Sequence, residues 1–461
     1  MTQPLMYKLI EAKKSVRRLY AEALVGRGDM DQERAELLLK DYQQQLERVF
    51  AETHEDAPTS GDEGLRPAED RDAAPEAPAS TAISAETLRA IGQAHIDVPE
   101  GFTVHPKLAA LLERRAKMAV DGGIDWGFAE LAAFGSLLME GVPVRLAGQD
   151  SQRGTFTQRH SVFHDRITGD EWAPLKNLSE DQAKFWVYNS LLSEYAALGF
   201  EYGYSVERSD ALVLWEAQFG DFVNGAQTII DEFISSADQK WSQTSSVVLL
   251  LPHGYEGQGP DHSSARIERF LQMCAEDNMR VVNPSTGANH FHLLREHAYA
   301  RPRRPLIVFT PKQLLRLKAA ANSVEDFTEG GFQPVIPDAG VDAKDVTRVV
   351  LVSGRLYYDL LARREKSGDT STAIVRVEQL YPLPLDEIRK ALRAYPVADV
   401  TWVQDEPANQ GPWPFMALNL VPQLDVPVTL VSRPASAATS AGTKGRHDQE
   451  LSTLLDAAFG R

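Results

Sequence analysis

The chain has 461 residues, 43% of them hydrophobic and 25% charged, a length and composition that predict two or three globular domains. Its formal net charge of −17 argues against nucleic acid and against an anionic membrane as main partners. One cysteine, Cys274, excludes an internal disulfide and suits a reducing cytoplasm. We find no signal peptide at the start and no apolar run near the roughly 20 residues of a membrane-spanning helix. A cytoplasmic location is therefore expected.

The amino-terminal quarter of the chain changes character twice. Residues 1–53 carry apolar side chains at three- and four-residue spacing, which predicts helices. Residues 54–82 are mainly Glu, Asp, Pro, Ala and Ser, with too little apolar surface to offset the entropy of ordering. This segment is predicted to be a disordered acidic linker. Residues 83–120 then predict a helical connector.

Residues 121–330 alternate apolar strands with helical patterns. The expected strands lie at 142–146, 211–215, 247–251, 280–282 and 306–309. The expected helices lie at 128–139, 186–203, 222–235, 264–275 and 290–300. Such alternation predicts a parallel sheet covered by helices on both faces.

A connection rich in Gly, Pro and Asp, at 330–345, leads to a second and smaller domain at 345–461. Its expected strands are 348–353, 373–377, 400–404 and 428–431, and its helices 356–366, 385–393 and 449–459. The predicted fold class is therefore α/β. A parallel-sheet domain is followed by a smaller α/β domain and preceded by a helical segment.

The loop PHGYEGQGPDHSSAR, at 252–266, directly follows the buried strand 247–251. Open α/β sheets bind their ligands at the carboxyl ends of strands, so this polar, glycine-rich loop predicts an active site. The sequence has no P-loop, no Gly-x-Ser-x-Gly, no cysteine pair and no His-Glu-x-x-His. Nucleotide kinases, serine hydrolases and zinc enzymes become unlikely classes, and no metal ligand is assigned in this chain.

Two other segments carry candidate site residues. Glu194 lies in the apolar pattern LLSEYAALGF, so its carboxylate is expected to be buried and to need a partner or a raised pKa. The pattern WEAQFGDF, at 215–222, predicts a strand end, a turn and a helix start with Asp221 as N-cap. Phe219 and Phe222 flank this turn, where they either stack on a planar heterocycle or belong to the core.

A third polar cluster, RGTFTQRH at 153–160, ends in His160. By itself it is either a contact for a phosphate or carboxylate or only a charged loop.

In their order along the chain, these segments resemble one family. It is the thiamine-diphosphate-dependent decarboxylating component of the 2-oxoglutarate dehydrogenase complex, in its actinobacterial dehydrogenase/decarboxylase version. The motifs that carry the resemblance are QD (149–150), RGTF (153–156), LSE (192–194), WEAQFGDF (215–222), the 252–266 loop, RPLIV (304–308), VRVEQL (375–380) and DEPANQG (405–411). The resemblance covers nearly all of 1–460 apart from the linker. It implies that 121–330 is a transketolase-like pyrimidine-binding domain and 345–461 the carboxyl-terminal domain.

The resemblance also implies roles for the cofactor-facing residues. Glu194 is expected to hydrogen-bond the aminopyrimidine ring of thiamine diphosphate and to promote formation of the ylid that attacks the substrate. Phe219 and Phe222 match the positions that sandwich the pyrimidine.

His253 and His262 match loop histidines near the substrate and the transferred acyl group. His160 is a further expected contact to the carboxylates of 2-oxoglutarate. The implied reaction is the oxidative decarboxylation of 2-oxoglutarate in the tricarboxylic acid cycle.

One feature of the family is absent. It holds the diphosphate and magnesium with Gly-Asp-Gly and a later Asn, and this sequence contains no Gly-Asp-Gly. We therefore expect only the carboxyl-terminal half of the component, with a diphosphate-binding half on another chain or upstream. A lipoyl-bearing acyltransferase component and assembly as a homodimer or heterotetramer are expected too. The alternative is a non-catalytic truncated product or binding module.

Overall fold

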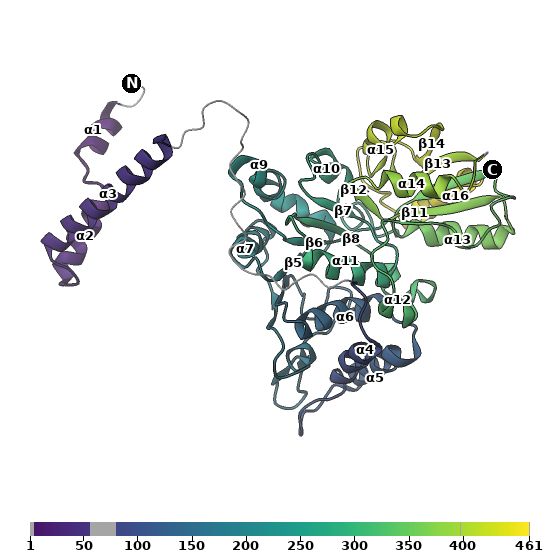
Figure 1. The fold of residues 1–461 in the computed structure, drawn as a ribbon, viewed down its shortest axis with the longest axis horizontal. Coiled ribbons are helices and arrows are strands. Elements are labelled where there is room, and N and C mark those ends of the chain that lie inside the picture. The colour runs from purple at the N-terminus through teal and green to yellow at the C-terminus, as the bar shows by residue number, and fades with distance from the viewer. Residues whose placement is uncertain (1–3, 56–79, 397, 461) are drawn as a thin grey trace. The chain divides into compact units, whose positions relative to one another are not determined.

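The computed structural model describes residues 4–55, 80–396 and 398–460 and divides into two units, Met1–Arg66 and Pro67–Arg461 (Figure 1). The described part of the first unit is helical, as expected, and consists of α1 (Pro4–Ala12), α2 (Val16–Arg27) and α3 (Gln32–Glu55). Ser15 caps α2 by accepting the Arg18 amide, and Gly28 ends it in the left-handed region at φ 79°. Residues 56–79, most of the expected linker, lie outside the described residues.

The larger unit contains a seven-stranded sheet in the order β12-β7-β8-β6-β5-β1-β4. Its strands are β1 (Val144–Gly148), β4 (Phe185–Asn189), β5 (Leu212–Glu216), β6 (Val248–Pro252), β7 (Arg280–Val282), β8 (Leu306–Thr310) and β12 (Gln379–Tyr381). All neighbours pair in parallel except β12, which runs antiparallel to β7. A small hairpin joins β2 (Phe163–His164) to β3 (Glu171–Trp172). The expected parallel sheet is confirmed.

One predicted helix is partly wrong. The expected helix 186–203 is a strand, β4, followed by a loop and then a helix that starts only at Glu194. The first four residues of β4, FWVY, are aromatic or β-branched and favour a pleated surface, and the strand pairs in register with β1.

Helices cover both faces of this sheet (Figure 1). They are α4 (Ala85–Ala94), α5 (Pro106–Asp121), α6 (Trp126–Met139), α7 (Glu194–Glu207), α8 (Gln227–Ile229), α9 (Ala237–Trp241), α10 (Ile267–Gln272), α11 (Gly287–Tyr299) and α12 (Glu325–Thr328). Successive strand residues face opposite sides. Val248 and Leu250 of β6 pack in the core of α6 and α11, whereas Leu249 and Leu251 pack in the core of α7 and α10.

Short irregular helices occupy several connections. They are η1 (Pro174–Lys176), η2 (Gly220–Ala226), the π-helix η3 (Ile230–Ile234), η4 (Gln313–Arg316), η5 (Lys318–Ala320) and η6 (Val421–Gln423). No helix among the described residues has the length and apolar character needed to cross a bilayer.

The carboxyl-terminal domain has a five-stranded sheet in the order β14-β13-β10-β11-β9. Its strands are β9 (Val335–Ile336), β10 (Arg348–Val352), β11 (Thr372–Val377), β13 (Asp399–Pro407) and β14 (Val428–Arg433). Its helices are α13 (Leu356–Ser367), α14 (Leu385–Leu392), α15 (Trp413–Asn419) and α16 (Lys444–Ala458). Only β9, in the expected connection, is antiparallel to its neighbour. The smaller α/β domain is confirmed.

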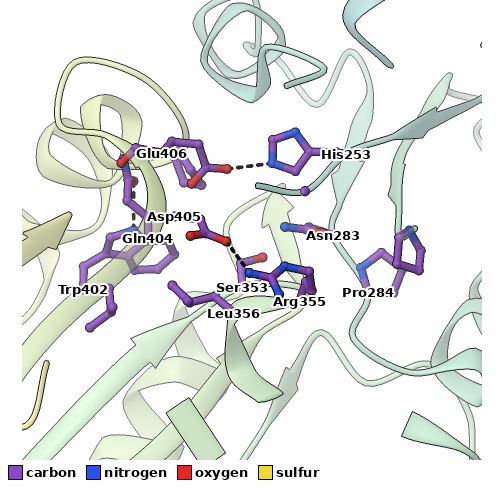
Figure 2. Close-up of a pocket in the computed structure, with 14 residues that line it drawn as sticks. His253, Asn283, Pro284, Ser353, Arg355, Leu356, Trp402, Gln404, Asp405 and Glu406 are labelled. Carbon is purple, nitrogen blue, oxygen red and sulfur yellow. Dashed lines mark hydrogen bonds and ion pairs between the residues drawn. The ribbon is translucent and has the colours of Figure 1, made fainter. Parts of the chain in front are cut away.

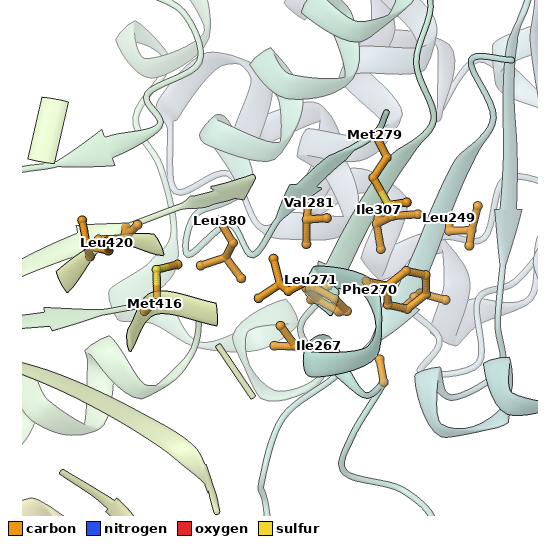
Figure 3. Packing of buried hydrophobic residues seen from close by; sticks show 14 of the residues in the cluster. Leu249, Ile267, Phe270, Leu271, Met279, Val281, Ile307, Leu380, Met416 and Leu420 are labelled. Carbon is orange, nitrogen blue, oxygen red and sulfur yellow. The ribbon is translucent and has the colours of Figure 1, made fainter. Parts of the chain in front are cut away.

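The two sheet domains share one apolar core. β12 belongs in sequence to the second domain but pairs with β7 of the first. Figure 3 shows Leu380 of β12 beside Val281 and near α10, with Met416 of α15 next along the same core. Each fully buried side chain of this kind contributes about 1.5–3 kcal/mol, so the shared core fixes the two sheets against each other.

Candidate active site

The candidate site residues follow the carboxyl ends of adjacent parallel strands. Gln149 follows β1, Glu194 comes after β4, Phe219 after β5 and His253 after β6, while Lys312 comes after β8. These strands are neighbours in the sheet, so the residues after them collect at one edge, where open α/β sheets bind ligands.

Glu194 is the first residue of α7, which Ser193 caps through its hydroxyl. A carboxylate in the first turn of a helix is stabilised by the helix dipole. Glu194 Oε1 accepts a hydrogen bond of 2.9 Å from Gln149 Nε2. The expectation of a buried Glu194 is wrong, because the side chain is half-buried. Its neighbours Leu191 and Leu192 are 80% and 86% exposed, so the apolar pattern here does not face the core.

The second oxygen of Glu194 faces η2. A Cβ placed on Gly225 would lie 3.3 Å from Glu194 Oε2, so glycine leaves room there that other residues would reduce. No side chain or amide of the described residues donates a hydrogen bond to this oxygen. One carboxylate oxygen therefore remains open to a ligand beside a glycine.

Phe219, Phe222 and His262 form an aromatic cluster, and Phe222 belongs to the same short helix, η2, as Gly225. The ring centroid of His262 lies 4.4 Å from that of Phe219 and 5.9 Å from that of Phe222, both edge-on. The two phenylalanine rings are 5.9 Å apart, and Phe156 meets Phe219 edge-on at 5.3 Å. All three clustered rings are half-buried, which leaves ring surface open to solvent.

Asp221 holds the turn against the 252–266 loop. Its Oδ1 accepts the amides of Ser263 and Ser264, both at 3.0 Å. The predicted N-cap role of Asp221 is therefore wrong, and η2 begins at Gly220 without a side-chain cap. A Cβ on Gly220 would contact Ala265 and lie 2.7 Å from the Pro252 carbonyl. This close approach of two backbones is what brings Phe219 and Phe222 to His262.

His253 lies deeper, at the seam between the two sheet domains. Its Nδ1 accepts the Ala265 amide at 3.1 Å, and its Nε2 lies 2.8 Å from Glu406 Oε1. Both side chains line a cavity of about 20 Å³. Figure 2 shows their hydrogen bond close to the ion pair of Arg355 and Asp405, which measures 3.0 Å. Because His253 is buried and both ring nitrogens are engaged, neither nitrogen is open to a substrate.

His160 lies in a different place. It lines a cavity of about 830 Å³ together with Lys107, Arg114, Arg316 and Lys318. Burial, with the charges of Arg115, Arg153 and Arg316, lowers the pKa of His160 to about 4. No hydrogen bond or ring contact among the described residues joins His160 to Glu194 or His262. Its segment contacts the aromatic cluster through Phe156.

Arg159 anchors that segment beneath the site. Its Nε donates to Glu130 at 2.7 Å, and both Nη atoms donate to Glu216, the last residue of β5, at 2.7 Å. Nη1 also donates to the Ser151 carbonyl at 3.0 Å. Burial alone would raise the pKa of Glu130, but the Arg159 charge and His290 lower it below the usual range. The network ties the 150–160 segment to the strand end that precedes Phe219.

The sequence assigned no individual role to Gln149, Arg159 or Lys312, although the first two lie in the QD and RGTFTQRH motifs. Lys312 Nζ donates to Gln258 at 2.6 Å and to the His262 carbonyl at 2.5 Å. Burial lowers the pKa of Lys312. The usable signal was positional, because Gln149 and Lys312 each lie three residues after the end of an expected strand, where polar site residues occur in parallel sheets.

Comparison with known proteins adds two domain matches. Residues 122–318 match the transketolase pyrimidine-binding domain, and residues 321–459 match the 2-oxoglutarate dehydrogenase C-terminal domain. The chain therefore contains a transketolase pyrimidine-binding domain and a 2-oxoglutarate dehydrogenase C-terminal domain. It is 52% identical over 476 aligned residues to the "Multifunctional 2-oxoglutarate metabolism enzyme" of Mycobacterium sp. (strain KMS). It is 53% identical over 470 residues to the "2-oxoglutarate dehydrogenase E1/E2 component" of Corynebacterium glutamicum.

The matches to these two relatives cover the whole of this chain and only a carboxyl-terminal part of each relative. The chain spans 37% of the length of the mycobacterial relative and 38% of the corynebacterial one. Both relatives therefore contain a large part with no counterpart in these 461 residues.

Proposed function

We propose that this chain supplies the pyrimidine-binding and carboxyl-terminal domains of an enzyme that decarboxylates 2-oxoglutarate with thiamine diphosphate. The observation that carries the proposal is the open Oε2 of Glu194 beside Gly225, in the same turn as Phe222. A flat, nitrogen-bearing ring fits the space beside Glu194 and Phe222, since it offers a hydrogen-bond partner to the carboxylate and a face to the aromatic rings.

The residues of this chain then have separate tasks. Glu194 holds a proton shared with a ring nitrogen of the cofactor, while Phe219 and Phe222 pack on the pyrimidine and exclude water. When bound, the cofactor would supply the sink for the electron pair that stays on the substrate carbon as carbon dioxide leaves. His262, whose imidazole is half-buried, exchanges a proton or hydrogen bond with the substrate. We propose that His160, in its separate basic cavity, is a further contact to the carboxylates of 2-oxoglutarate.

The diphosphate and magnesium are assigned to residues outside this chain. The sequence has no Gly-Asp-Gly, and the relatives continue well beyond the matched part. We propose that this diphosphate-binding half is either another chain or an upstream segment of the same polypeptide. We also propose that the succinyl product passes to a lipoyl-bearing acyltransferase component, and that this reaction takes place in the cytoplasm.

A partner surface next to Glu194 supports a shared site. Leu191 and Leu192 are almost fully exposed, and Tyr195 is 53% exposed on the first turn of α7. Exposed apolar side chains gathered in this way mark interfaces. We propose that they are covered in a homodimer or heterotetramer that brings the diphosphate-binding half to Glu194.

The test is co-expression of this chain with the preceding part of the Corynebacterium glutamicum relative, followed by purification of the assembly. Carbon dioxide release from 2-oxoglutarate should require both polypeptides, thiamine diphosphate and magnesium. A stable, folded assembly without this activity would contradict the proposal and favour a non-catalytic binding module.

A further inference from the structure

We infer that the carboxyl-terminal domain positions His262 by clamping the 253–266 loop, with the buried pair of His253 and Glu406 at the root of the clamp. The inference rests on the proposed function of His262 and assigns His253 as a positioning residue. It differs from the role that the family resemblance implies for His253.

The hydrogen bonds of His253 define its tautomer. Because Nδ1 accepts the Ala265 amide at 3.1 Å, it carries no proton, and the ring proton resides on Nε2. Nε2 then donates to Glu406 Oε1 at 2.8 Å. Both side chains are buried, so this charge-assisted bond is shielded from water. Nδ1 faces the Ala265 N–H and Nε2 faces Glu406 Oε1, so the ring acts as a fixed link between the loop and the carboxyl-terminal domain.

The loop above this link needs external support. Gly254, Gly257 and Gly259 all adopt positive φ angles, at 153°, 74° and 86°. Glycine in such conformations has large freedom in the absence of contacts. The position of His262 therefore depends on the hydrogen bonds that hold the loop at other points.

The carboxyl-terminal domain supplies several of these contacts. Thr439 Oγ1 donates to the Pro260 carbonyl at 2.6 Å, and Ser440 Oγ donates to Ser263 Oγ at 3.1 Å. His447 of α16 lies against Gly257, where a Cβ would come within 3.3 Å of its ring. The loop thus touches the second domain on both sides of His262.

The pyrimidine-binding domain holds the opposite side of the loop. Lys312 donates to the His262 carbonyl, and Asp221 accepts the amides of Ser263 and Ser264. His262 therefore lies between two sets of contacts, one from each domain. Among the residues that the structure describes, Glu406 is the one carboxylate bonded to His253, so its removal leaves a buried N–H without an acceptor.

Hydrogen–deuterium exchange of the isolated chain tests the clamp without cofactor. Glu406→Ala should speed amide exchange in the 254–265 loop by about tenfold or more, the range expected for loss of a charged hydrogen bond. Glu406→Gln should restore most of the protection, because the amide oxygen can still accept the Nε2 proton. Asp386→Ala removes a 94% exposed carboxylate of the same domain and should leave the loop unchanged. Loop exchange unaltered by Glu406→Ala would overturn the inference.

Nitrogen-15 spectra of the parent chain, labelled at its histidines, report which ring nitrogen of His253 carries the proton. This measurement does not depend on whether a Glu406 variant folds. The signal that disappears in His253→Gln should show a proton on Nε2 and a bare Nδ1. A proton on Nδ1 would overturn the inference.

In the assembled enzyme, Glu406→Ala should lower kcat for 2-oxoglutarate at least tenfold with little change in KM, and Glu406→Gln should recover most of kcat. If Glu406→Ala speeds exchange in the loop but leaves kcat unchanged, the loop contacts stand and the positioning role of His253 is contradicted. An assembly inactive even with the parent chain would instead contradict the proposed function, while the exchange and nitrogen-15 results would still decide the clamp.

Discussion

Replacing Arg159 by Met should strongly destabilise the larger unit. The guanidinium is fully buried and makes three charged hydrogen bonds of 2.7 Å to the carboxylates of Glu130 and Glu216. Met fills a similar volume but provides no charge. The variant leaves two carboxylates, 3% and 5% exposed, without their cation.

The expected loss follows from this arrangement. Removing one partner of a buried ion pair costs about 3–5 kcal/mol, because an uncompensated charge stays in the interior. We expect the upper part of this range, since Arg159 is bonded to two carboxylates. Arg159→Lys should lose less, because an ammonium keeps the charge but cannot bond both oxygens of Glu216 in parallel.

Urea unfolding followed by tryptophan fluorescence measures this loss. Trp215, in β5 beside Glu216, is a probe at the site of the change. The control is Arg89→Met, since Arg89 makes a 2.7 Å ion pair with Glu86 on the protein surface. Its unfolding midpoint should equal that of the parent chain. An Arg159→Met chain as stable as this control would refute the reasoning that the buried network supports the site.

Two more predictions concern acid and close packing. Burial lowers the pKa of His95 to about 3 and that of His297 to about 4, so unfolded chains, with histidine pKa near 6.5, take up protons first as pH falls. The stabilising contribution of these two neutral side chains is fully present well above pH ~6.5. At pH ~5.5 the two together should lower the free energy of unfolding by about 3 kcal/mol relative to that higher pH. Urea unfolding at the two pH values measures this loss, and equal stability would contradict the prediction. Gly220→Ala should cost about 1–3 kcal/mol and displace Phe219 from His262, because the added methyl meets Ala265. An unchanged melting temperature and unchanged histidine spectrum would argue against that contact.

The fold was predictable where strands are continuous apolar runs. β6 and β8 are buried on both faces, so their sequences contain hardly any polar residue and stand out from their neighbours. β4 was missed because its residues merge with the helical pattern of α7. The short β12 was missed because its pairing with β7 depends on a partner far away in the chain.

The site was predictable as a set of residues but not as an arrangement. The order of motifs indicated Glu194, Phe219, Phe222 and His262. The half-buried position of Glu194 was not predictable, because a sequence does not distinguish exposed leucines such as Leu191 and Leu192 from buried ones. The contacts of Asp221 and Lys312 join segments that are distant in sequence, and only the folded sheet brings them together.

The most direct test of the central claim is the rate of carbon dioxide release from 2-oxoglutarate by the assembled enzyme carrying Glu194→Gln. The amide keeps the size of the side chain and its contact with Gln149 but cannot hold the proton shared with the cofactor ring. We predict a fall of about 10²–10⁴-fold, with the assembly and its unfolding midpoint unchanged. A rate close to that of the parent enzyme would contradict the role assigned to Glu194.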